Sequence, residues 1–219
     1  MKIKNIASIC KKSKNITIFE RHDRPEIMQY IGDGYAAYPA AGLPELDEET
    51  LLTIFDVPEK DRDKYHVHTS PIPDGVDFAD VHNGERMIEQ ENVSINYGGR
   101  VLLPLRTGGG LVFIDSCYLK PVSDVLDVLE LYERRTAAGM TYIVAKAGFL
   151  LQAVIMPYDV IDEKFVEMLH ALASDCGLTL DAKKHAARLE HADDPEQFTL
   201  PVDPDTGELL EDGNEVAEE

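Results

Sequence analysis

The sequence predicts an α+β fold: an antiparallel sheet built from two helix–β-hairpin–helix pseudo-repeats, with the helices packed on the sheet. Short β-branched and aromatic runs separated by glycine turns are typical of hairpins, and capped stretches with apolar residues at helical spacing flank them. The stretch "YIGDGYAAYPAAGLPELDEETLLTIF" from Tyr30 is also echoed by "FLLQAVIMPYDVIDEKFVEMLHAL" from Phe149. Each passes from an apolar strand through proline and an acidic pair to an apolar helical stripe, which favours two similar halves.

The first half, about residues 1–57, is predicted to begin with an amphipathic helix over 2–13, because isoleucines recur at helical spacing between lysines. "NITIF" then predicts a strand. "IMQYI" and "YAAYP" predict two more strands, which turn at "GDG", where glycine accepts positive φ. The half ends in a helix over 47–57, since Asp47 can accept hydrogen bonds from the open amides and Pro58 stops the helix.

The stretch after this helix is polar and broken by proline and glycine, so it predicts an irregular excursion over residues 58–90. "NVSINYGGRVLLPLRTGGGLVFID" then predicts two or three strands that turn at its glycines. The second half, about residues 111–177, contains a helix predicted over 119–135 from the apolar stripe of Leu119, Val122, Leu126 and Leu129.

The second half continues with a hairpin in "MTYIVAKAGFLLQAVIMP" and a helix over 162–173, which Asp162 caps and Gly177 ends. The two halves are predicted to share one core in a single domain, residues 1–180, followed by an acidic and mostly disordered tail, residues 181–219. True duplication and two ordinary hairpin units with common caps both stay open, because few residues of the echo are identical.

Charge is distributed unevenly along the 219 residues, whose formal net charge is −20. Residues 190–219 contain no lysine or arginine, whereas the start of the chain carries the candidate binding lysines Lys2, Lys4, Lys11, Lys12 and Lys14. An acidic protein is repelled by bare phosphate backbones. We therefore expect contact with nucleic acid only through a partner, or through a homo-oligomer that collects the basic heads on one face.

The cysteines, Cys10, Cys117 and Cys176, are odd in number and widely spaced, which argues against a disulfide framework and for a reducing compartment. No apolar run approaches the roughly 18 residues that span a membrane. The basic start lacks the continuous apolar segment of a signal peptide. The sequence thus predicts a cytoplasmic location, no membrane partner and no cofactor.

The segment "VFIDSCYLKPVSDVL … YIVAKAGFLLQAVIMPYDV" resembles one unit of a DNA sliding clamp, the polymerase processivity factor. In that family a strand feeds a helix, a meander of strands follows, and the unit is repeated. A bacterial clamp chain ends in a strand with an apolar-Met-Pro element, like residues 154–157 here. The resemblance covers less than half of the chain, and it implies a ring whose helices line a basic hole.

The chain departs from the clamp pattern in its helices. The predicted helices over 47–57 and 162–173 are extra, and the exposed face of the predicted 119–135 helix is acidic, so it would repel DNA. Only the lysine-rich N-terminal helix suits an inner lining. "QFTLP" from Gln197 resembles the short Gln-led apolar peptides with which partners dock on clamps, although a chance Phe and Leu in a disordered tail explain it more simply.

Two sets of residues are candidates for chemistry. His66, His68 and His82, with nearby aspartates, are candidate metal ligands because imidazole and carboxylate suit Zn²⁺, but their lack of fixed spacing favours a solvated polar loop. Cys117 stands at a strand-to-helix junction, where helix amides can lower a thiol pKa and make a nucleophile. The absence of a nucleophile-elbow pattern favours instead a packed, inert cysteine.

Other motifs have simpler interpretations. Tyr30, Tyr35 and Tyr38 are candidate binding residues on an exposed aromatic surface, although alternation along strands predicts a half-buried sheet. "TGGG" and "GDG" lack the order of a phosphate loop and are interpreted as hairpin turns. The acidic residues at 47–49 and 162–163 are explained by capping rather than by acid–base catalysis.

Three functions are compatible with these features. The first is a non-enzymatic binding or accessory protein in a nucleic-acid-handling assembly, clamp-like in form and working with a protein partner. The second is an acidic inhibitor or decoy that offers its carboxylates to a basic protein surface. The third is a small hydrolase that uses Cys117 or the histidine loop. The absence of any familiar enzyme motif favours a binding role over an enzymatic one.

Overall fold

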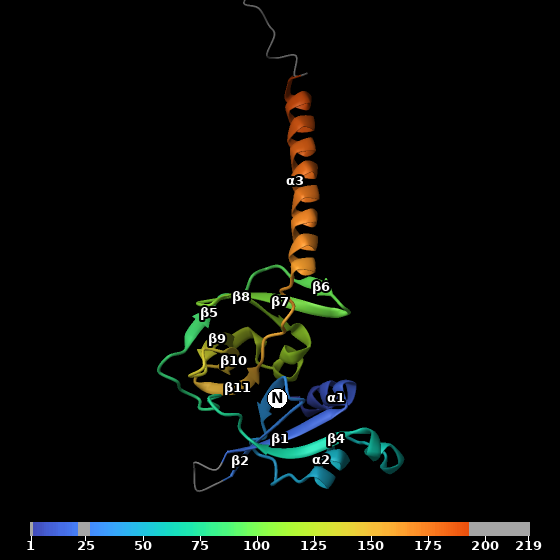
Figure 1. Ribbon diagram of the computed structural model, residues 1–219, viewed down its shortest axis with the longest axis vertical. Helices are drawn as coiled ribbons and strands as arrows, with labels where there is room; N and C mark the ends of the chain where they lie inside the picture. Colours follow the sequence, from blue (N-terminus) through green and yellow to red (C-terminus); the bar gives the residue numbers. More distant parts are fainter. Residues whose placement is uncertain (1, 22–26, 193–219) are drawn as a thin grey trace, which may run out of the picture. The chain divides into compact units, whose positions relative to one another are not determined.

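The computed structural model describes residues 2–21 and 27–192 of the chain (Figure 1). The chain divides into two compact units, Met1–Val160 and Ile161–Glu219. The first unit holds all the strands of the described residues, and the second holds one long helix. The predicted α+β class is confirmed, with a mostly antiparallel sheet.

Short strands joined by turns and short helices make up the first unit. In the first unit they are α1 (Ile3–Ser13), β1 (Asn15–Arg21), β2 (Met28–Gly32), β3 (Ala36–Pro39), α2 (Glu48–Ile54), the 3₁₀ helix η1 (Glu59–Lys64), β4 (His66–Pro71), β5 (Arg86–Ile88), β6 (Ile95–Tyr97), β7 (Arg100–Thr107), β8 (Gly110–Asp115), the 3₁₀ helices η2 (Ser116–Val122) and η3 (Leu126–Val128), β9 (Leu129–Arg135), β10 (Thr141–Ala147) and β11 (Leu150–Ile155). The second unit contains α3 (Glu163–Ala192).

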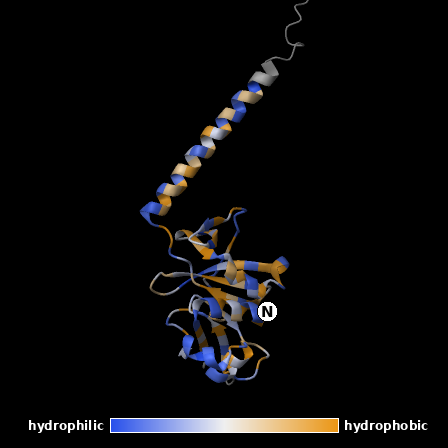
Figure 2. Ribbon diagram, turned by 90° about the vertical axis from the view of Figure 1, so that its right-hand side faces the viewer, coloured by the Kyte–Doolittle hydropathy of each residue, from blue (hydrophilic) through white to orange (hydrophobic). Residues whose placement is uncertain are grey.

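Eight strands form one sheet in the order β4-β1-β2-β3-β11-β10-β9-β5. Every neighbouring pair is antiparallel except β1 and β4, which run parallel. The predicted hairpins β2–β3 and β10–β11 are confirmed, and they meet where Ala37 pairs with Val154. Strands β6, β7 and β8 form a second, antiparallel sheet. Figure 2 shows apolar residues concentrated on the strands of this unit.

Helices α1 and α2 form where the sequence predicts them. Ile6, Ala7 and Cys10 lie on one side of α1 and are buried, because this spacing places them on the same helical face. They join the larger apolar core, to which strands of the eight-stranded sheet contribute. At the start of α2 the side chain of Asp47 accepts a hydrogen bond from the Thr50 amide at 2.7 Å, so the predicted cap is confirmed.

The "GDG" turn between β2 and β3 depends on its glycines. A Cβ on Gly32 would lie 1.7 Å from the carbonyl oxygen of Ala36, which is too close for any side chain. Gly34 has a φ of +92°. Between them, Asp33 accepts hydrogen bonds from the amides of Tyr35 and Ala36 at 3.0 and 3.1 Å. The turn therefore directs a buried carboxylate back toward the chain that follows it.

The helix predicted over 119–135 is wrong. The segment forms the short helices η2 and η3 and then strand β9. Pro121 lies inside η2, where its missing N–H prevents a longer α-helix. From Leu129 onward the side chains alternate as a strand requires, with Leu131 buried and paired with Ala145 on β10. The apolar residues at helical spacing thus belong to three different elements: η2, η3 and β9.

The irregular excursion predicted over residues 58–90 is also corrected, because it contains η1, β4 and β5. β4 and β5 lie at opposite edges of the eight-stranded sheet. The chain between them, residues 72–85, must therefore cross the sheet; we call it the strap. Phe78 of the strap is buried with Phe19 and Tyr30, and its ring centroid lies 4.6 Å from that of Tyr30. The strap thus covers a second apolar cluster.

A buried ion cluster fastens the strap to β9 and β10. Arg134, whose side chain is 0% exposed, donates to Glu85 from Nε at 3.0 Å and from Nη2 at 2.5 Å. Its Nη1 donates to the carbonyls of Asp77 and Ala79 at 3.0 and 2.8 Å. Lys146 completes the cluster with a 2.6 Å contact to Glu85. Such pairing is what makes buried charges tolerable.

The second unit confirms the predicted helix start but not its end. The side chain of Asp162 accepts a hydrogen bond from the Phe165 amide at 2.7 Å. Gly177 does not terminate the helix, because α3 runs on to Ala192 through good helix formers. The helix therefore includes the first residues of the predicted tail, while residues 193–219, with "QFTLP", lie outside the described residues.

Candidate anion-binding pocket beside helix α1

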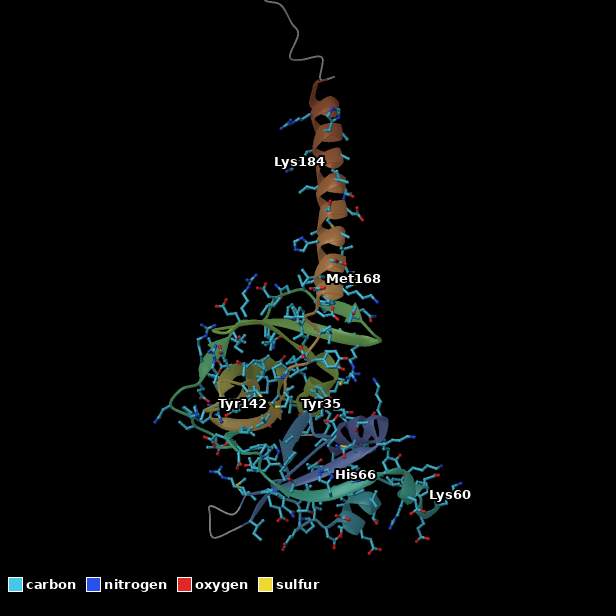
Figure 3. The ribbon with its side chains drawn as sticks, in the orientation of Figure 1. Tyr35, Lys60, His66, Tyr142, Met168 and Lys184 are labelled. Carbon is cyan, nitrogen blue, oxygen red and sulfur yellow. The ribbon has the colours of Figure 1, made fainter. Side chains whose placement is uncertain are left out.

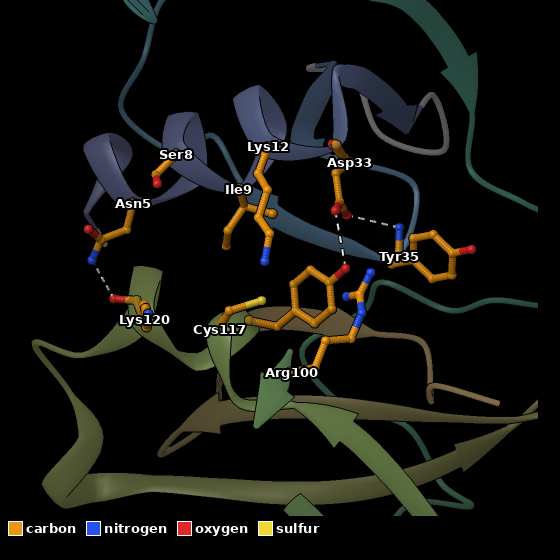
Figure 4. A pocket seen from close by; sticks show the side chains of 11 residues that line it. Asn5, Ser8, Ile9, Lys12, Asp33, Tyr35, Arg100, Cys117 and Lys120 are labelled. Carbon is orange, nitrogen blue, oxygen red and sulfur yellow. Dashed lines mark hydrogen bonds between the residues drawn. The ribbon is translucent and has the colours of Figure 1, made fainter. Parts of the chain in front are cut away.

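A pocket of about 260 Å³ lies between α1, the β2–β3 turn, the start of β7 and η2 (Figure 4). It is slightly smaller than the cavities that hold drug-sized ligands, so it suits a small group or one end of a larger ligand. Its polar lining includes Asn5, Ser8, Lys12, Asp33, Arg100 and Lys120.

Hydrogen bonds to the chain around η2 hold α1 in place along one side of the pocket. The backbone amide of Lys2 donates to the carbonyl of Pro121, and the Asn5 amide group donates to the carbonyl of Lys120, both at 2.7 Å. The Lys2 ammonium also donates to the Ser123 hydroxyl at 2.7 Å. The first of these contacts satisfies a backbone amide at the helix start that has no partner within the helix.

The carboxylate of Asp33 is a fixed feature of the pocket wall, only 5% exposed. Besides the amides of the turn, it accepts a hydrogen bond from the Tyr118 hydroxyl at 3.1 Å. Burial, followed by the charge of Asp33, raises the pKa of Tyr118. Tyr118 therefore stays protonated and keeps donating, and its carbonyl accepts from the Tyr38 hydroxyl at 2.8 Å.

Arg100 is held at the pocket by two contacts. Its guanidinium forms a 3.0 Å ion pair with Asp115 and lies 4.8 Å from the centre of the Tyr158 ring. Burial alone would raise the pKa of the Asp115 carboxyl, but the Cys117 amide and Arg100 together lower it below its ordinary value. Asp115 therefore largely neutralises the charge of Arg100.

Cys117 is a partly buried free thiol that lines the pocket. Burial, with the neighbouring Asp115 carboxylate, raises its pKa to about 12, although the nearby Lys12 partly opposes this. The thiolate is the reactive form of cysteine, so at neutral pH this side chain is almost entirely in its unreactive form. A raised pKa favours the packed, inert cysteine over the nucleophile.

Lys12 and Lys120 also line the pocket that holds the Asp33 carboxylate. Neither Lys12 nor Lys120 forms an ion pair with any residue in 2–21 or 27–192. Figure 4 shows Lys12 and Cys117 pointing toward one another across the pocket. With the hydroxyl of Ser8 and the two ammonium groups as donors, this arrangement can accept a phosphate or carboxylate group.

The five lysines predicted as binding residues gather on and beside α1. Lys2, Lys4, Lys12 and Lys14 are exposed, and Lys11 is half-buried. Lys11 donates to the carbonyl of Asp56 at 3.2 Å. The lysines lie away from the buried side of the helix, so they form a basic surface that continues into the pocket.

The predicted aromatic surface is corrected, because Tyr30 and Tyr38 are buried in the first unit at 2% and 0% exposure. Only Tyr35, 56% exposed, is accessible, and it lines the pocket (Figure 3). The interpretation of "TGGG" as a hairpin turn is confirmed by the pairing of Thr107 with Gly110.

The histidines do not form a metal centre with the surrounding described residues. His66 and His68 lie on the same side of β4, with ring centroids 4.9 Å apart, while His82 lies in the strap and accepts a hydrogen bond from the Gly84 amide. Across the described part of the chain, no group of three or more histidine, cysteine, aspartate or glutamate side chains converges. Nor is any helix among those residues long and apolar enough to cross a membrane.

Sequence reasoning missed Asp33, Arg100 and Lys120 as pocket residues. They come from three segments that are far apart in the sequence, and none belongs to a motif. Comparisons with protein-family models, curated proteins and solved structures found no match to this chain. The proposed function therefore depends on the geometry of the pocket and of the basic surface.

Proposed function

We propose that this protein is a non-enzymatic binding protein of a nucleic-acid-handling assembly, and that it holds phosphate groups on the basic surface of α1 and in the adjoining pocket. One observation carries the proposal: Lys4, Lys12 and Lys120 are exposed and have no carboxylate partner among the described residues. Unpaired cations gathered at one place attract phosphates even on an acidic protein, because charges more than about 10 Å away are largely screened by salt.

The order of elements supports a clamp-like organisation. The succession α1, β1, β2, β3 is followed later in the chain by η2, β9, β10, β11, and the two groups of strands meet in mirror order at β3 and β11. This is the arrangement that two pseudo-repeats would give. The second group has 3₁₀ turns where the first has a helix, so α1 is the candidate lining helix. The free cysteines fit a cytoplasmic location.

The proposal is tested by fluorescence anisotropy of the full chain with labelled single- and double-stranded DNA at several salt concentrations. Lys4→Gln and Lys12→Gln should each weaken binding and lower the slope of log K against log salt by about one. Lys60→Gln is the matched control, since Lys60 is an exposed lysine on η1 (Figure 3). Absence of DNA binding at low salt, or an equal effect of all three substitutions, overturns the proposal.

The clamp-like form has a separate test. A ring stays on closed circular DNA and slides off the ends of linear DNA, so retention should fall when the circle is cut. Equal retention on circular and linear DNA would exclude a ring, and the protein would then be a simple phosphate-binding protein.

A further inference from the structure

Tyr35 is an aromatic side chain that the first unit leaves exposed at the edge of the pocket beside α1. It is 56% exposed, whereas Tyr30 and Tyr38 of the same hairpin are buried. Its hydroxyl has no hydrogen-bond partner among the described residues. Tyrosines that are apolar on the ring and polar at the tip are enriched where proteins bind their partners. The ring of Tyr35 is therefore available to a ligand of the pocket.

The backbone of Tyr35 is fixed although its ring is exposed. Its amide donates a hydrogen bond to the Asp33 carboxylate at 3.0 Å, and its carbonyl accepts one from the Met156 amide at 2.7 Å. Holding a group in position before the ligand arrives reduces the entropy that binding costs. The β2–β3 turn therefore presents the ring in advance as a platform at one end of the pocket (Figure 4).

Charge is unevenly distributed along the pocket. Figure 4 shows Lys120 at one end, Tyr35 and Asp33 toward the other, and Lys12 between them. Asp33 forms no ion pair with any described residue, and the charge of Arg100 is already largely neutralised. A phosphate group is attracted by the lysines and repelled by the carboxylate. It should therefore lie toward Lys120 and leave the Tyr35 end to an uncharged part of the ligand.

We infer that the pocket takes one unpaired nucleotide of a single nucleic-acid strand, with its phosphate at Lys12 and Lys120 and its base stacked on the ring of Tyr35. This inference deepens the proposed function and rests on it, because the lysines must hold the phosphate. Proteins that bind single strands combine a positively charged surface with aromatic rings on which bases stack. A base inside a duplex is already stacked on its neighbours, so it cannot lie on the ring.

The Asp33 carboxylate favours a base at this end of the pocket. One of its oxygens accepts hydrogen bonds from the amides of Tyr35 and Ala36, and the other accepts one from the Tyr118 hydroxyl. A carboxylate has about four acceptor sites, so one stays open to an N–H donor of the ligand. An unpaired base offers such donors on its Watson–Crick edge, whereas a fully ionised phosphate offers none.

Fluorescence anisotropy of the full chain with a labelled oligothymidine strand, which forms no duplex, tests the inference. Tyr35→Ala should weaken binding at least about fivefold, the effect of losing one stacked base. Tyr35→Phe keeps the ring and should restore most of the lost affinity. Phe149→Ala is the matched control, since Phe149 is 82% exposed on the β10–β11 turn and does not line the pocket. Thermal melting establishes that the variants stay folded.

An abasic strand of the same length separates base stacking from phosphate contact. The unsubstituted and Tyr35→Ala chains should bind this strand equally well, and duplex DNA equally well, whereas Lys12→Gln should weaken binding to all three forms of DNA.

Two results overturn the inference: a Tyr35→Ala loss that is the same on the thymidine and abasic strands, or one no larger than that of Phe149→Ala. If Lys12→Gln still weakens binding in those cases, the proposed function stands without the stacked base. Absence of DNA binding by the unsubstituted chain at low salt overturns the proposed function and the inference together.

Discussion

Replacing Arg134 by methionine should destabilise the first unit by several kilocalories per mole. The substitution keeps an apolar stem of similar length but removes four hydrogen bonds, two to Glu85 and one each to the carbonyls of Asp77 and Ala79. Glu85, whose side chain is only 13% exposed, then loses its ion pair with Arg134 and retains the one with Lys146. Breaking a buried ion pair from one side costs about 3–5 kcal/mol.

This loss is large against the roughly 5–15 kcal/mol that stabilises a typical domain, and it corresponds to a fall in Tm of roughly 10 °C for a unit of this size. Urea titration and thermal melting followed by circular dichroism measure it. Arg106→Met is the control, since Arg106 pairs with Glu91 while 77% exposed and should change stability by less than about 0.5 kcal/mol. If Arg134→Met were as mild as Arg106→Met, the buried cluster would not be what fastens the strap.

Three further outcomes are expected. Partial burial alone would raise the pKa of Glu85, but hydrogen bonds from Lys146 and Arg134 lower it. The ionised Glu85 should therefore stabilise the fold above an ordinary carboxyl pKa of about 4.3, and this stabilisation should be lost as the pH falls below that value. Glu85→Gln should flatten that part of a plot of Tm against pH. Cys117 should resist iodoacetamide at pH 8 in the folded chain and react after unfolding, and rapid labelling of the folded chain would contradict its raised pKa. Gly32→Ala should lower the free energy of unfolding by at least about 2 kcal/mol in urea titration, because the new Cβ clashes with the following turn. Gly177→Ala should instead stabilise α3 by up to about 1 kcal/mol, because the new Cβ would meet nothing within 4 Å.

Short sequence patterns predicted the elements whose formation depends on residues that are close together in the sequence. The lysine-interrupted isoleucines of α1, the cap of α2 at Asp47 and the cap of α3 at Asp162 were all readable, because helix starts depend on residues three or four positions apart. The hairpins were readable for the same reason, since their turns need glycine.

The elements that sequence reasoning missed depend on distant partners. β4 is a half-exposed edge strand with little apolar alternation, and it forms because β1 offers a parallel edge. β9 carries leucines that fit either a helix or a strand, and only pairing with β10 decides between them. The pocket depends on the same long-range closure, because Asp33, Arg100 and Lys120 come together only when the sheet and α1 are assembled.

The seam between β3 and β11 has a consequence for biosynthesis. Ala37 emerges from the ribosome long before Val154, with which it pairs, so the outer edge of β3 stays open while most of the first unit is being translated. An open edge invites pairing with other nascent chains. The brevity of β3, which ends at Pro39, limits that hazard, since proline offers no amide to an intruding strand.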